Sequence, residues 1–380
     1  MLRFEKIIKT ATIRMEPVLI NKERCSKTRS NLSKCKNCVD ICPVNGINFK
    51  NKEMVLNDNC IQCGLCAGVC PTAALSIQEP TETGLYTHIK KAIKRKDTVV
   101  ISCKQNEDVT NAGFEVPCLG SLTLEFLLKI DTLENPINIV FSEEKCERCM
   151  VEEGINHYLN NIEQIKIIEK DLKLVGGSIK NTEKSPRIKR KKIKKDDDID
   201  DERREFLTSV FKSAKRLPKE VIKNILNPEE LNKSSNLVLP NPTFRRYPLL
   251  GEISLSLNKE ELNNVEMLNY MKPTLNGVCY FCNACVILCP IGALKYSEEE
   301  EKLNLFIIKD ACSGCGLCTE VCYHKALEME PKKAEDFSSK EPSILAIGTK
   351  QVCNICNQKI TASETIEVCS SCVKLGKVKK

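Results

Sequence analysis

The segment Cys60-Ile61-Gln62-Cys63-Gly64-Leu65-Cys66-Ala67-Gly68-Val69-Cys70-Pro71 has the spacing C-x2-C-x2-C-x3-C-P. Few structures other than a cubane iron–sulfur site require four cysteines at these intervals. Three thiolates two residues apart can surround one corner of a cluster only if the backbone curls tightly, and Gly64 suits that turn because it can adopt a positive φ. In two-cluster ferredoxins the fourth cysteine binds the other cluster, so the segment predicts a second motif nearby.

A second motif lies directly upstream, and the pair recurs later in the chain. The three further motifs are Cys25-x9-Cys35-x2-Cys38-x3-Cys42-Pro43, Cys279-x2-Cys282-x2-Cys285-x3-Cys289-Pro290 and Cys312-x2-Cys315-x2-Cys318-x3-Cys322. Sixteen cysteines in this register are not expected of ordinary buried cysteines. The sequence therefore predicts two dicluster ferredoxin units with four [4Fe–4S] clusters.

Each fourth cysteine is expected to leave on the following helix and to bind the neighbouring cluster. The predicted ligand sets are Cys25, Cys35, Cys38 and Cys70; Cys60, Cys63, Cys66 and Cys42; Cys279, Cys282, Cys285 and Cys322; and Cys312, Cys315, Cys318 and Cys289. Two departures from the pattern stand out. Nine residues instead of two separate Cys25 from Cys35, which inserts a basic loop at 27–30, and Tyr323 replaces the proline after Cys322 without removing a ligand.

The composition favours small modules held together by metal. The chain has 380 residues with 24 Cys, no Trp and 5% aromatic residues, which argues against one large apolar core. Its cysteines form six groups of four, which suits metal ligands better than loop-closing disulfides, so we expect a reducing, cytoplasmic environment. No apolar run approaches 18 residues and the charged first 20 residues include no signal segment, so we expect neither a membrane span nor export.

Residues 85–168 are expected to alternate between helix and strand, with strands at 98–102, 114–116, 137–141 and 164–168 and helices at 88–95, 121–130 and 151–160. This alternation predicts a small α/β domain with a mainly parallel sheet. Cys103, Cys118, Cys146 and Cys149 each follow a strand, and strand ends of a parallel sheet meet at one edge. They are predicted to form a fifth metal site; the alternative is that Cys103 and Cys118 are ordinary buried cysteines.

The run Val116-Pro117-Cys118-Leu119-Gly120-Ser121-Leu122, with Cys103 and the Cys146/Cys149 pair, resembles the small iron–sulfur (delta) subunit of the methyl-viologen-reducing hydrogenase and heterodisulfide reductase systems. That resemblance implies a [2Fe–2S] cluster at these four cysteines, whereas the residues themselves are equally compatible with zinc. The order of segments also resembles a group of bacterial multi-cluster 4Fe–4S binding proteins.

The C-terminal segment contains two cysteine pairs with the spacing Cys353-x2-Cys356-x12-Cys369-x2-Cys372. Two such knuckles can supply a tetrahedral four-sulfur site of the kind that holds structural zinc. A single iron of the rubredoxin type is the alternative, but the segment has no aromatic residue and a short spacer. We therefore expect zinc.

Net charge does not indicate a nucleic-acid-binding protein. The formal charge is +7 with neutral thiols. Each loaded four-thiolate site carries about −2, so six sites bring the net charge to about −5. Residues 180–195 hold nine Lys or Arg and one acid, and 196–201 are mostly acidic. Such opposed blocks are typical of a solvated linker, although binding of nucleic acid or anionic lipid is the alternative.

No catalytic residues are expected, because the sequence has no P-loop and no G-x-G-x-x-G, and His88, His157 and His324 stand in no recognisable constellation. Gly176-Gly177 is expected to be a turn. The favoured function is an electron carrier that serves a flavin- or molybdenum-containing oxidoreductase. The alternatives are the iron–sulfur subunit of a hydrogenase or heterodisulfide-reductase-like complex, and a zinc-dependent nucleic-acid-binding or scaffolding protein.

The expected fold is α+β and multidomain, with two ferredoxin-like units flanking a small α/β domain. The predicted divisions are 1–85, a dicluster unit; 86–178, the α/β domain with its four-cysteine site; 179–240, a charged flexible linker with short helices; 241–331, the second dicluster unit; and 332–380, a zinc-ribbon-like module.

Overall fold

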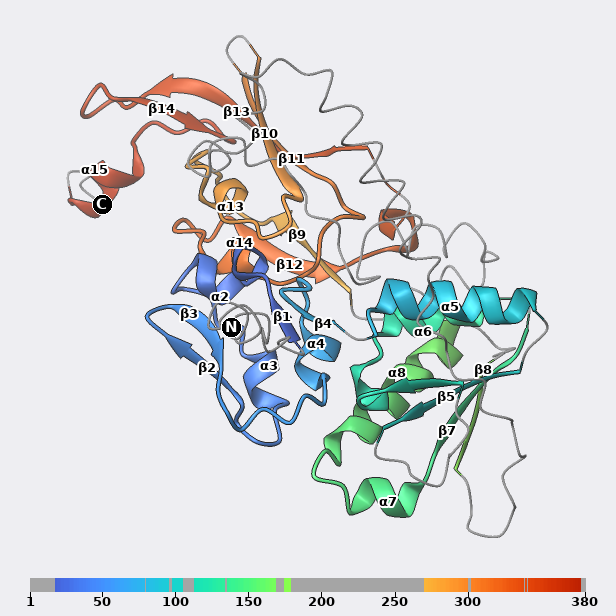
Figure 1. Ribbon diagram of the computed structural model, residues 1–380. Helices are drawn as coiled ribbons and strands as arrows, with labels where there is room; N and C mark the ends of the chain where they lie inside the picture. The colour runs from blue at the N-terminus through green and yellow to red at the C-terminus, as the bar shows by residue number, and fades with distance from the viewer. Residues whose placement is uncertain are drawn as a thin grey trace, which may run out of the picture. The chain divides into compact units, whose positions relative to one another are not determined.

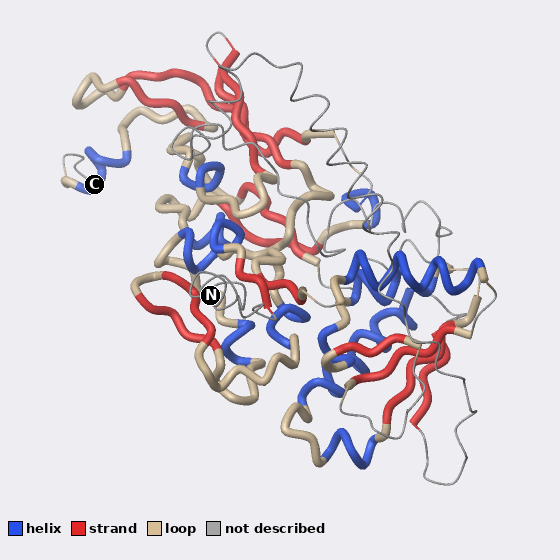
Figure 2. Tube along the Cα trace, in the orientation of Figure 1, coloured by secondary structure: helices blue, strands red, loops and turns tan. Residues whose placement is uncertain are grey.

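The structure is a computed structural model that describes residues 18–178, with gaps at 79, 96–97, 105–112, 134 and 169–173, and residues 270–376, with gaps at 300–301, 338 and 340. All described residues belong to one compact unit, formed by residues 1–185 together with 242–380. Figure 1 labels its helices and strands, and Figure 2 distinguishes them by type along the chain. The linker predicted at 179–240, its short helices and the start of the second ferredoxin unit lie outside the described residues.

The first ferredoxin unit consists of two antiparallel strand pairs around short helices. Strand β1 (Val18–Ile20) pairs with β4 (Leu75–Ile77), and β2 (Ile47–Lys50) forms a hairpin with β3 (Glu53–Leu56). Asn51 and Lys52 both have positive φ, which matches a tight turn whose twist suits a hairpin. Helices α2 (Ser26–Arg29), α3 (Asn37–Asp40) and α4 (Leu65–Val69) carry or precede the cysteines.

The core of this unit contains almost as many cysteines as aliphatic side chains. Val18, Ile47, Met54 and Leu75 are each no more than 2% exposed. They pack with four buried cysteines, Cys25, Cys38, Cys66 and Cys70. So small an apolar core gives little stability by itself, which is the situation in which a bound metal centre contributes to folding.

The second ferredoxin unit repeats this arrangement and extends it. Strand β9 (Met271–Leu275) pairs with β12 (Leu327–Pro331), and β10 (Leu294–Glu299) forms a hairpin with β11 (Lys302–Ile307), close to the strand expected at 303–308. Helices α13 (Ala284–Ile287) and α14 (Leu317–Glu320) correspond to α3 and α4. Strand β11 also pairs with β13 (Ser343–Val352), which pairs with β14 (Lys359–Ala362), so the C-terminal segment continues the sheet of this unit.

The α/β domain has the parallel sheet that the sequence predicted. Strands β5 (Val99–Cys103), β6 (Phe114–Val116), β7 (Ile137–Phe141) and β8 (Leu174–Ser178) are arranged in the order β6-β5-β7-β8, and all three pairings are parallel. Helices α5 (Glu82–Lys94), α6 (Leu124–Asp131), α7 (Glu143–Glu147) and α8 (Glu153–Ile168) connect or flank the strands (Figure 1). The α5 and α6 helices begin at Thr81 and Thr123, whose hydroxyls accept backbone N–H bonds.

Two local expectations in this domain were wrong. Residues 164–168 are the end of helix α8 and not a strand, because the apolar positions Tyr158, Ile162 and Ile165 recur at helical intervals and are all buried. The fourth strand is β8, so Gly176 and Gly177 lie in a strand and not in a turn. They pair with Ile139 and Val140 of β7. A glycine pair gives no side-chain signal of strand structure, and only the pairing with β7 reveals it.

Within the described residues, no helix combines the length and the apolar character needed to cross a membrane.

Candidate iron–sulfur and metal sites

The cysteine motifs share one backbone conformation, including residues that do not favour it. The residue directly before the second cysteine of a motif has a positive φ in Gln62, Phe281 and Gly314, at 62°, 50° and 62°. The third residue after the fourth cysteine also has a positive φ in all four motifs, namely Asn45, Ala73, Gly292 and Lys325. Non-glycine residues adopt this conformation rarely, so its recurrence indicates that a shared tertiary requirement imposes it.

Each fourth cysteine also accepts a hydrogen bond from the backbone four residues later. The N–H groups of Gly46, Ala74, Ala293 and Ala326 donate to the sulfurs of Cys42, Cys70, Cys289 and Cys322 at 3.1, 3.2, 3.3 and 3.3 Å. Hydrogen bonds of this kind stabilise thiolates and tune the centre that the thiolates bind. The four motifs therefore share the conformation after the fourth cysteine and the hydrogen bond to it, and three of them also share the positive φ before the second cysteine.

In the first unit the structure brings together cysteines from different motifs. Burial raises the pKa of the Cys38 thiol to about 12, and the thiolates of Cys70, Cys35 and Cys25 lie close enough to raise it as well. Burial also raises the pKa of Cys66, with smaller contributions from its neighbours, Cys63 and Cys60 among them. The thiolate of Cys42 in turn acts on Cys63, after burial. Each fourth cysteine thus lies beside the thiols of the other motif.

The second unit shows the same crossed grouping. Burial raises the pKa of Cys285 to about 12, and its neighbouring thiolates are Cys279, Cys282 and Cys322. Burial raises the pKa of Cys315 to about 11, and its neighbouring thiolates are Cys289 and Cys312. Cys318 also lies near these two. In each unit, therefore, thiols of both motifs lie near one another, and Cys25 lies near Cys35 and Cys38 despite its nine-residue interval.

This donor set fits [4Fe–4S] clusters. Four thiolates crowded into a partly buried space repel one another and are poorly solvated, which is why these pKa values are raised. A cationic iron–sulfur core compensates both effects and keeps the ligands deprotonated. The residues present, four thiols with N–H donors at each fourth sulfur, are what such a group requires.

The four central cysteines occupy the ends of neighbouring strands and the turns that follow them. Cys103 ends β5, Cys118 precedes the short helix η2 (Leu119–Ser121), and Cys146 and Cys149 lie in and after α7. Burial raises the pKa of Cys118 to about 12, with the thiolates of Cys103, Cys63 and Cys149 nearby. Burial raises that of Cys146 to about 11, with Cys103 and Cys149 nearby. These thiols gather at one edge of the sheet, and one of them lies close to a cluster ligand of the first unit.

Close contacts between glycines make that proximity possible. A Cβ atom at Gly68 of α4 would overlap the carbonyl oxygen of Gly120 in η2, and a Cβ at Gly120 would overlap that of Gly154 in α8. A Cβ at Gly154 would overlap the sulfur of Cys118. The three backbones can approach this closely only because none of these residues has a side chain. We call Gly68, Gly120 and Gly154 the glycine junction. Through it the segment that contains Cys118 packs against α4, the helix that contains Cys66.

The inserted basic loop connects the two ferredoxin units. The guanidinium of Arg29 donates to the carbonyl oxygens of Leu288, at 3.0 Å, and Ile287, at the end of α13. The backbone N–H of Lys34 donates to the carboxylate of Glu320 in α14. A cation at a helix C-terminus is favourable because the last carbonyls are free to accept. The nine-residue interval between Cys25 and Cys35 therefore provides a connection that the usual two-residue interval could not reach.

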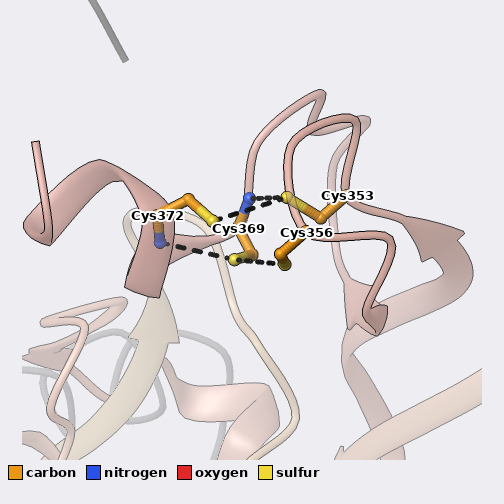
Figure 3. Close-up of side chains that lie close together, drawn as sticks. All are labelled: Cys353, Cys356, Cys369 and Cys372. Carbon is orange, nitrogen blue, oxygen red and sulfur yellow. Dashed lines mark hydrogen bonds between the residues drawn. The ribbon is translucent and has the colours of Figure 1, made fainter. Parts of the chain in front are cut away.

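The C-terminal cysteines form the tightest thiol group in the described part of the chain. The sulfurs of Cys353, Cys356, Cys369 and Cys372 all lie within 4.8 Å of one another. Figure 3 shows the four side chains close together. The Cys356 and Cys369 sulfurs are 3.7 Å apart, and those of Cys353 and Cys372 are 4.0 Å apart. A tetrahedral zinc ion with Zn–S bonds of about 2.3 Å requires sulfurs about 3.8 Å apart. The group has the dimensions of a single-ion site.

Hydrogen bonds pre-arrange this group. The N–H of Cys369 donates to the Cys353 sulfur at 3.3 Å, and that of Cys372 donates to the Cys369 sulfur at 3.4 Å (Figure 3). Backbone N–H groups of Cys369 and Cys356 lower the pKa of Cys353, because they stabilise its thiolate form. Thiolates of this kind bind metal readily.

Several residues of these sites carry no signal in the sequence. Arg29, Gly120 and Gly154 act through contacts with residues that are distant in the sequence. Only for Arg29 did the sequence give an indication, because it lies in the inserted loop at 27–30. Of the histidines, His324 lines the cavity that Cys279, Cys282, Cys285 and Cys322 surround, where its ring stacks on Tyr280.

Comparisons with known proteins agree with the cysteine pattern. A model of the 4Fe-4S dicluster domain matches residues 33–74 and 278–326. Pyruvate synthase subunit PorD of Methanothermobacter marburgensis is 38% identical over 63 residues, covering 16% of this chain and 69% of that protein. PorD of Thermotoga maritima is 36% identical over 72 residues, covering 19% and 68%.

A longer but weaker similarity involves a larger protein. Subunit alpha 1 of the acetyl-CoA decarbonylase/synthase complex of Methanosarcina barkeri is 28% identical over 128 residues, which are 30% of this chain and 16% of that protein. The chain thus spans about a sixth of that relative. The comparison with solved structures found no match.

Proposed function

This chain belongs to the family of 4Fe–4S dicluster ferredoxins, and from that premise we propose that it is an electron-transfer protein whose sixteen motif cysteines hold four [4Fe–4S] clusters. A cluster of this type gains and loses single electrons at a potential set by its surroundings. The chain's own residues supply the thiolates, the N–H donors to them, and the packing that keeps neighbouring sites close together.

The observation that carries the proposal is the crossed grouping of cysteines in both units. Cys70 lies with Cys35 and Cys38, and Cys322 lies with Cys279 and Cys285. A crossed ligand set ties two sites into one small module, which suits the passage of electrons between them. Structural zinc sites have no need of such a pair.

We further propose that the central cysteines hold a [2Fe–2S] cluster. Their sulfurs do not form a group as compact as the C-terminal one among the described residues, which favours a centre with two irons and bridging sulfide over one tetrahedral ion. The glycine junction supports a role in series with the first ferredoxin unit, because it holds Cys118 near Cys63. Resemblance to the hydrogenase and heterodisulfide reductase delta subunit points the same way.

The partner that we propose is a redox enzyme complex in which this chain supplies or removes electrons. Two of its relatives are named as subunits of pyruvate synthase and of an acetyl-CoA decarbonylase/synthase complex. A subunit role in a complex of that kind is therefore the second candidate beside a free electron carrier. Anaerobic purification with and without crosslinking distinguishes the two, because a subunit co-purifies with its enzyme in a fixed ratio.

The first prediction concerns the metal content. Anaerobically purified protein should contain about 16 iron and 16 acid-labile sulfide per chain, and about two more of each if the central site is [2Fe–2S]. Iron and sulfide assays, together with the spectra of the reduced protein, measure this. A value near eight would mean that one dicluster unit holds no clusters, and a colourless protein that contains only zinc would favour the scaffolding or nucleic-acid-binding alternative.

A second prediction concerns the C-terminal site, which we propose to hold zinc. Cys356→Ser should remove about one zinc per chain and leave the iron content unchanged, since the site is separate from the sixteen cluster cysteines and Zn²⁺ carries no electrons. Metal analysis of both proteins tests this, with Ser371→Ala in the same module as the control. Loss of one iron together with a redox signal would show a rubredoxin-like site instead.

A further inference from the structure

We propose that the C-terminal module, which was predicted at 332–380, packs over one of the four cluster sites when its own metal is bound. This cluster site is that of Cys279, Cys282, Cys285 and Cys322. Tyr323, Ser363 and Gly348 are the positioning residues that hold the module there. The inference rests on the proposed function in that a cluster occupies this site. It goes beyond that function by giving the C-terminal metal site a role in controlling a single cluster.

A pair of hydrogen bonds ties the module to the first ligand of this set. The N–H of Ser363, directly after β14, donates to the carbonyl oxygen of Cys279 at 2.9 Å. The N–H of Cys279 donates in return to the Ser363 hydroxyl at 2.9 Å. Both backbone polar groups of a ligand residue are therefore satisfied by the C-terminal module, which fixes the start of the cluster-binding turn.

A second contact holds the same turn two residues later. Phe281 lies between Cys279 and Cys282, has a φ of 50°, and places its ring against Gly348 of β13. A Cβ at Gly348 of β13 would overlap one carbon of this ring and lie 2.7 Å from two others. The ring therefore rests directly on the backbone of β13, and any larger residue at 348 would lift it. This explains a glycine in the middle of a long strand.

The third contact explains the departure of this motif from the common pattern. In the first unit Pro71 follows Cys70, but here Tyr323 follows Cys322. The ammonium group of Lys374 lies 3.4 Å from the centroid of the Tyr323 ring, a cation–π contact that proline could not provide. His324 packs edge-on against Tyr323 and stacks on Tyr280, with ring centroids 5.2 and 4.1 Å apart. Aromatic rings thus link the last ligand, the first motif turn and the C-terminal module.

The metal of the C-terminal module controls whether this cover forms. Lys374 lies in helix α15 (Ser370–Lys374), two residues after Cys372. The buried core of the module consists of Cys353, Cys369 and Cys372, with only Ile360 and Val368 packed against them. Without a metal ion the module has too little apolar surface to hold α15 in place. Loss of the ion should therefore release Lys374 from Tyr323 and loosen the contacts at Ser363 and Gly348.

Release of the cover should change one cluster and leave three as they were. Cluster potential depends on nearby hydrogen bonds and on the position of the ligands, and the C-terminal module fixes the backbone of Cys279 with two hydrogen bonds, while Cys282 is exposed. All three contacts fall on residues within or next to the ligand set of Cys279, Cys282, Cys285 and Cys322. The other ligand sets serve as controls within the same molecule.

The experiment uses the full chain, purified anaerobically, and compares three proteins with the wild type. Tyr323→Pro restores the usual motif and removes the ring, Cys356→Ser removes the C-terminal metal, and Lys359→Ala alters an exposed lysine of β14 as the control. Chelation of zinc from the wild type repeats the second case without a mutation. Cys282→Ser identifies the signal of the affected cluster, because this residue belongs to that set alone.

Four readouts are expected to agree: hydrogen exchange, zinc release, midpoint potential and stability in air. In Tyr323→Pro the amides of α15 should exchange hydrogen several-fold faster and zinc should pass to a colorimetric chelator several-fold faster, while all iron is retained. The affected cluster is the one whose signal is missing from the reduced Cys282→Ser protein. In Tyr323→Pro, in Cys356→Ser and in the chelated wild type, this signal should shift in midpoint potential. The same cluster should also bleach several-fold faster in air. Lys359→Ala should behave as the wild type.

The proposal is overturned if all four cluster signals keep their potentials and air stability after zinc removal, or if Tyr323→Pro leaves α15 exchange and zinc release unchanged. Failure of the proposed function looks different. A protein without any iron–sulfur signal would refute electron transfer, yet hydrogen exchange at residues 279–282 after zinc removal would still show whether the module covers this turn.

Discussion

Cys70→Ala should cost the protein about four iron and four sulfide, all from the site of Cys25, Cys35 and Cys38, and leave the site that contains Cys60, Cys63 and Cys66 intact. The reason is that Cys70 lies beside Cys35 and Cys38, which belong to the other motif of the unit. Its removal leaves three thiols at one site and four, with Cys42, at the other. A cubane with one ligand missing is far more easily lost.

Two companion variants identify which cluster has gone. Cys35→Ser should remove the same signal from the spectrum of the reduced protein as Cys70→Ala does, whereas Cys63→Ser should remove a different one. Cys42→Ala is the mirror case and should match Cys63→Ser. If Cys70→Ala instead resembles Cys63→Ser, each motif binds its own cluster with four local ligands, and the crossed assignment is wrong.

Gly120→Val should be the most damaging substitution outside the cysteines. A Cβ at this position would overlap the carbonyl oxygen of Gly154 and lie 2.6 Å from the Leu65 side chain. Because two of the opposing groups are backbone atoms, the helices must move apart, and overpacking of this kind lowers the free energy of unfolding by about 1–3 kcal/mol. The same substitution should separate Cys118 from the first ferredoxin unit.

Gly113→Ala is the matched control, because the nearest atom to a Cβ there is the carbonyl oxygen of Val100 at 3.6 Å, an ordinary contact. Denaturant midpoints followed by circular dichroism compare the two proteins. Hydrogen exchange in α4 and the magnetic coupling between the central centre and its neighbour report on the junction. A Gly120→Val protein as stable as Gly113→Ala, with unchanged coupling, would mean that the two modules do not pack through these glycines.

The cysteine spacing by itself determined most of what concerns the clusters. The interval C-x2-C-x2-C constrains a short turn, and its backbone is set by residues that are neighbours in sequence, so Gln62, Phe281 and Gly314 repeat one conformation. The crossed ligand sets were predicted from an expected position of each fourth cysteine on the next helix; in the structure each lies just after a short helix, α3, α4, α13 or α14. The α/β domain was also predictable, because alternating periods of apolar residues depend only on local geometry.

Local signals failed where two periods overlapped or where side chains were lacking. Residues 164–168 include three isoleucines, and such β-branched residues suggested a strand. In the structure Ile162 and Ile165 instead continue the buried face of α8. Gly176 and Gly177 became a strand because β7 offers an edge with which they pair. In both cases tertiary packing selected between local alternatives of similar energy.

Only the tertiary structure decided how the modules join. Arg29 donates to a carbonyl oxygen at the end of α13, more than half of the chain away in sequence. Gly68 packs against Gly120, and Ser363 forms hydrogen bonds with the backbone of Cys279. Such contacts depend on the path of the whole chain, since neither partner has a local requirement for the other. The sequence therefore determined which cysteines we propose as metal ligands, whereas the fold decided which of these cysteine groups are neighbours and which one the C-terminal module contacts.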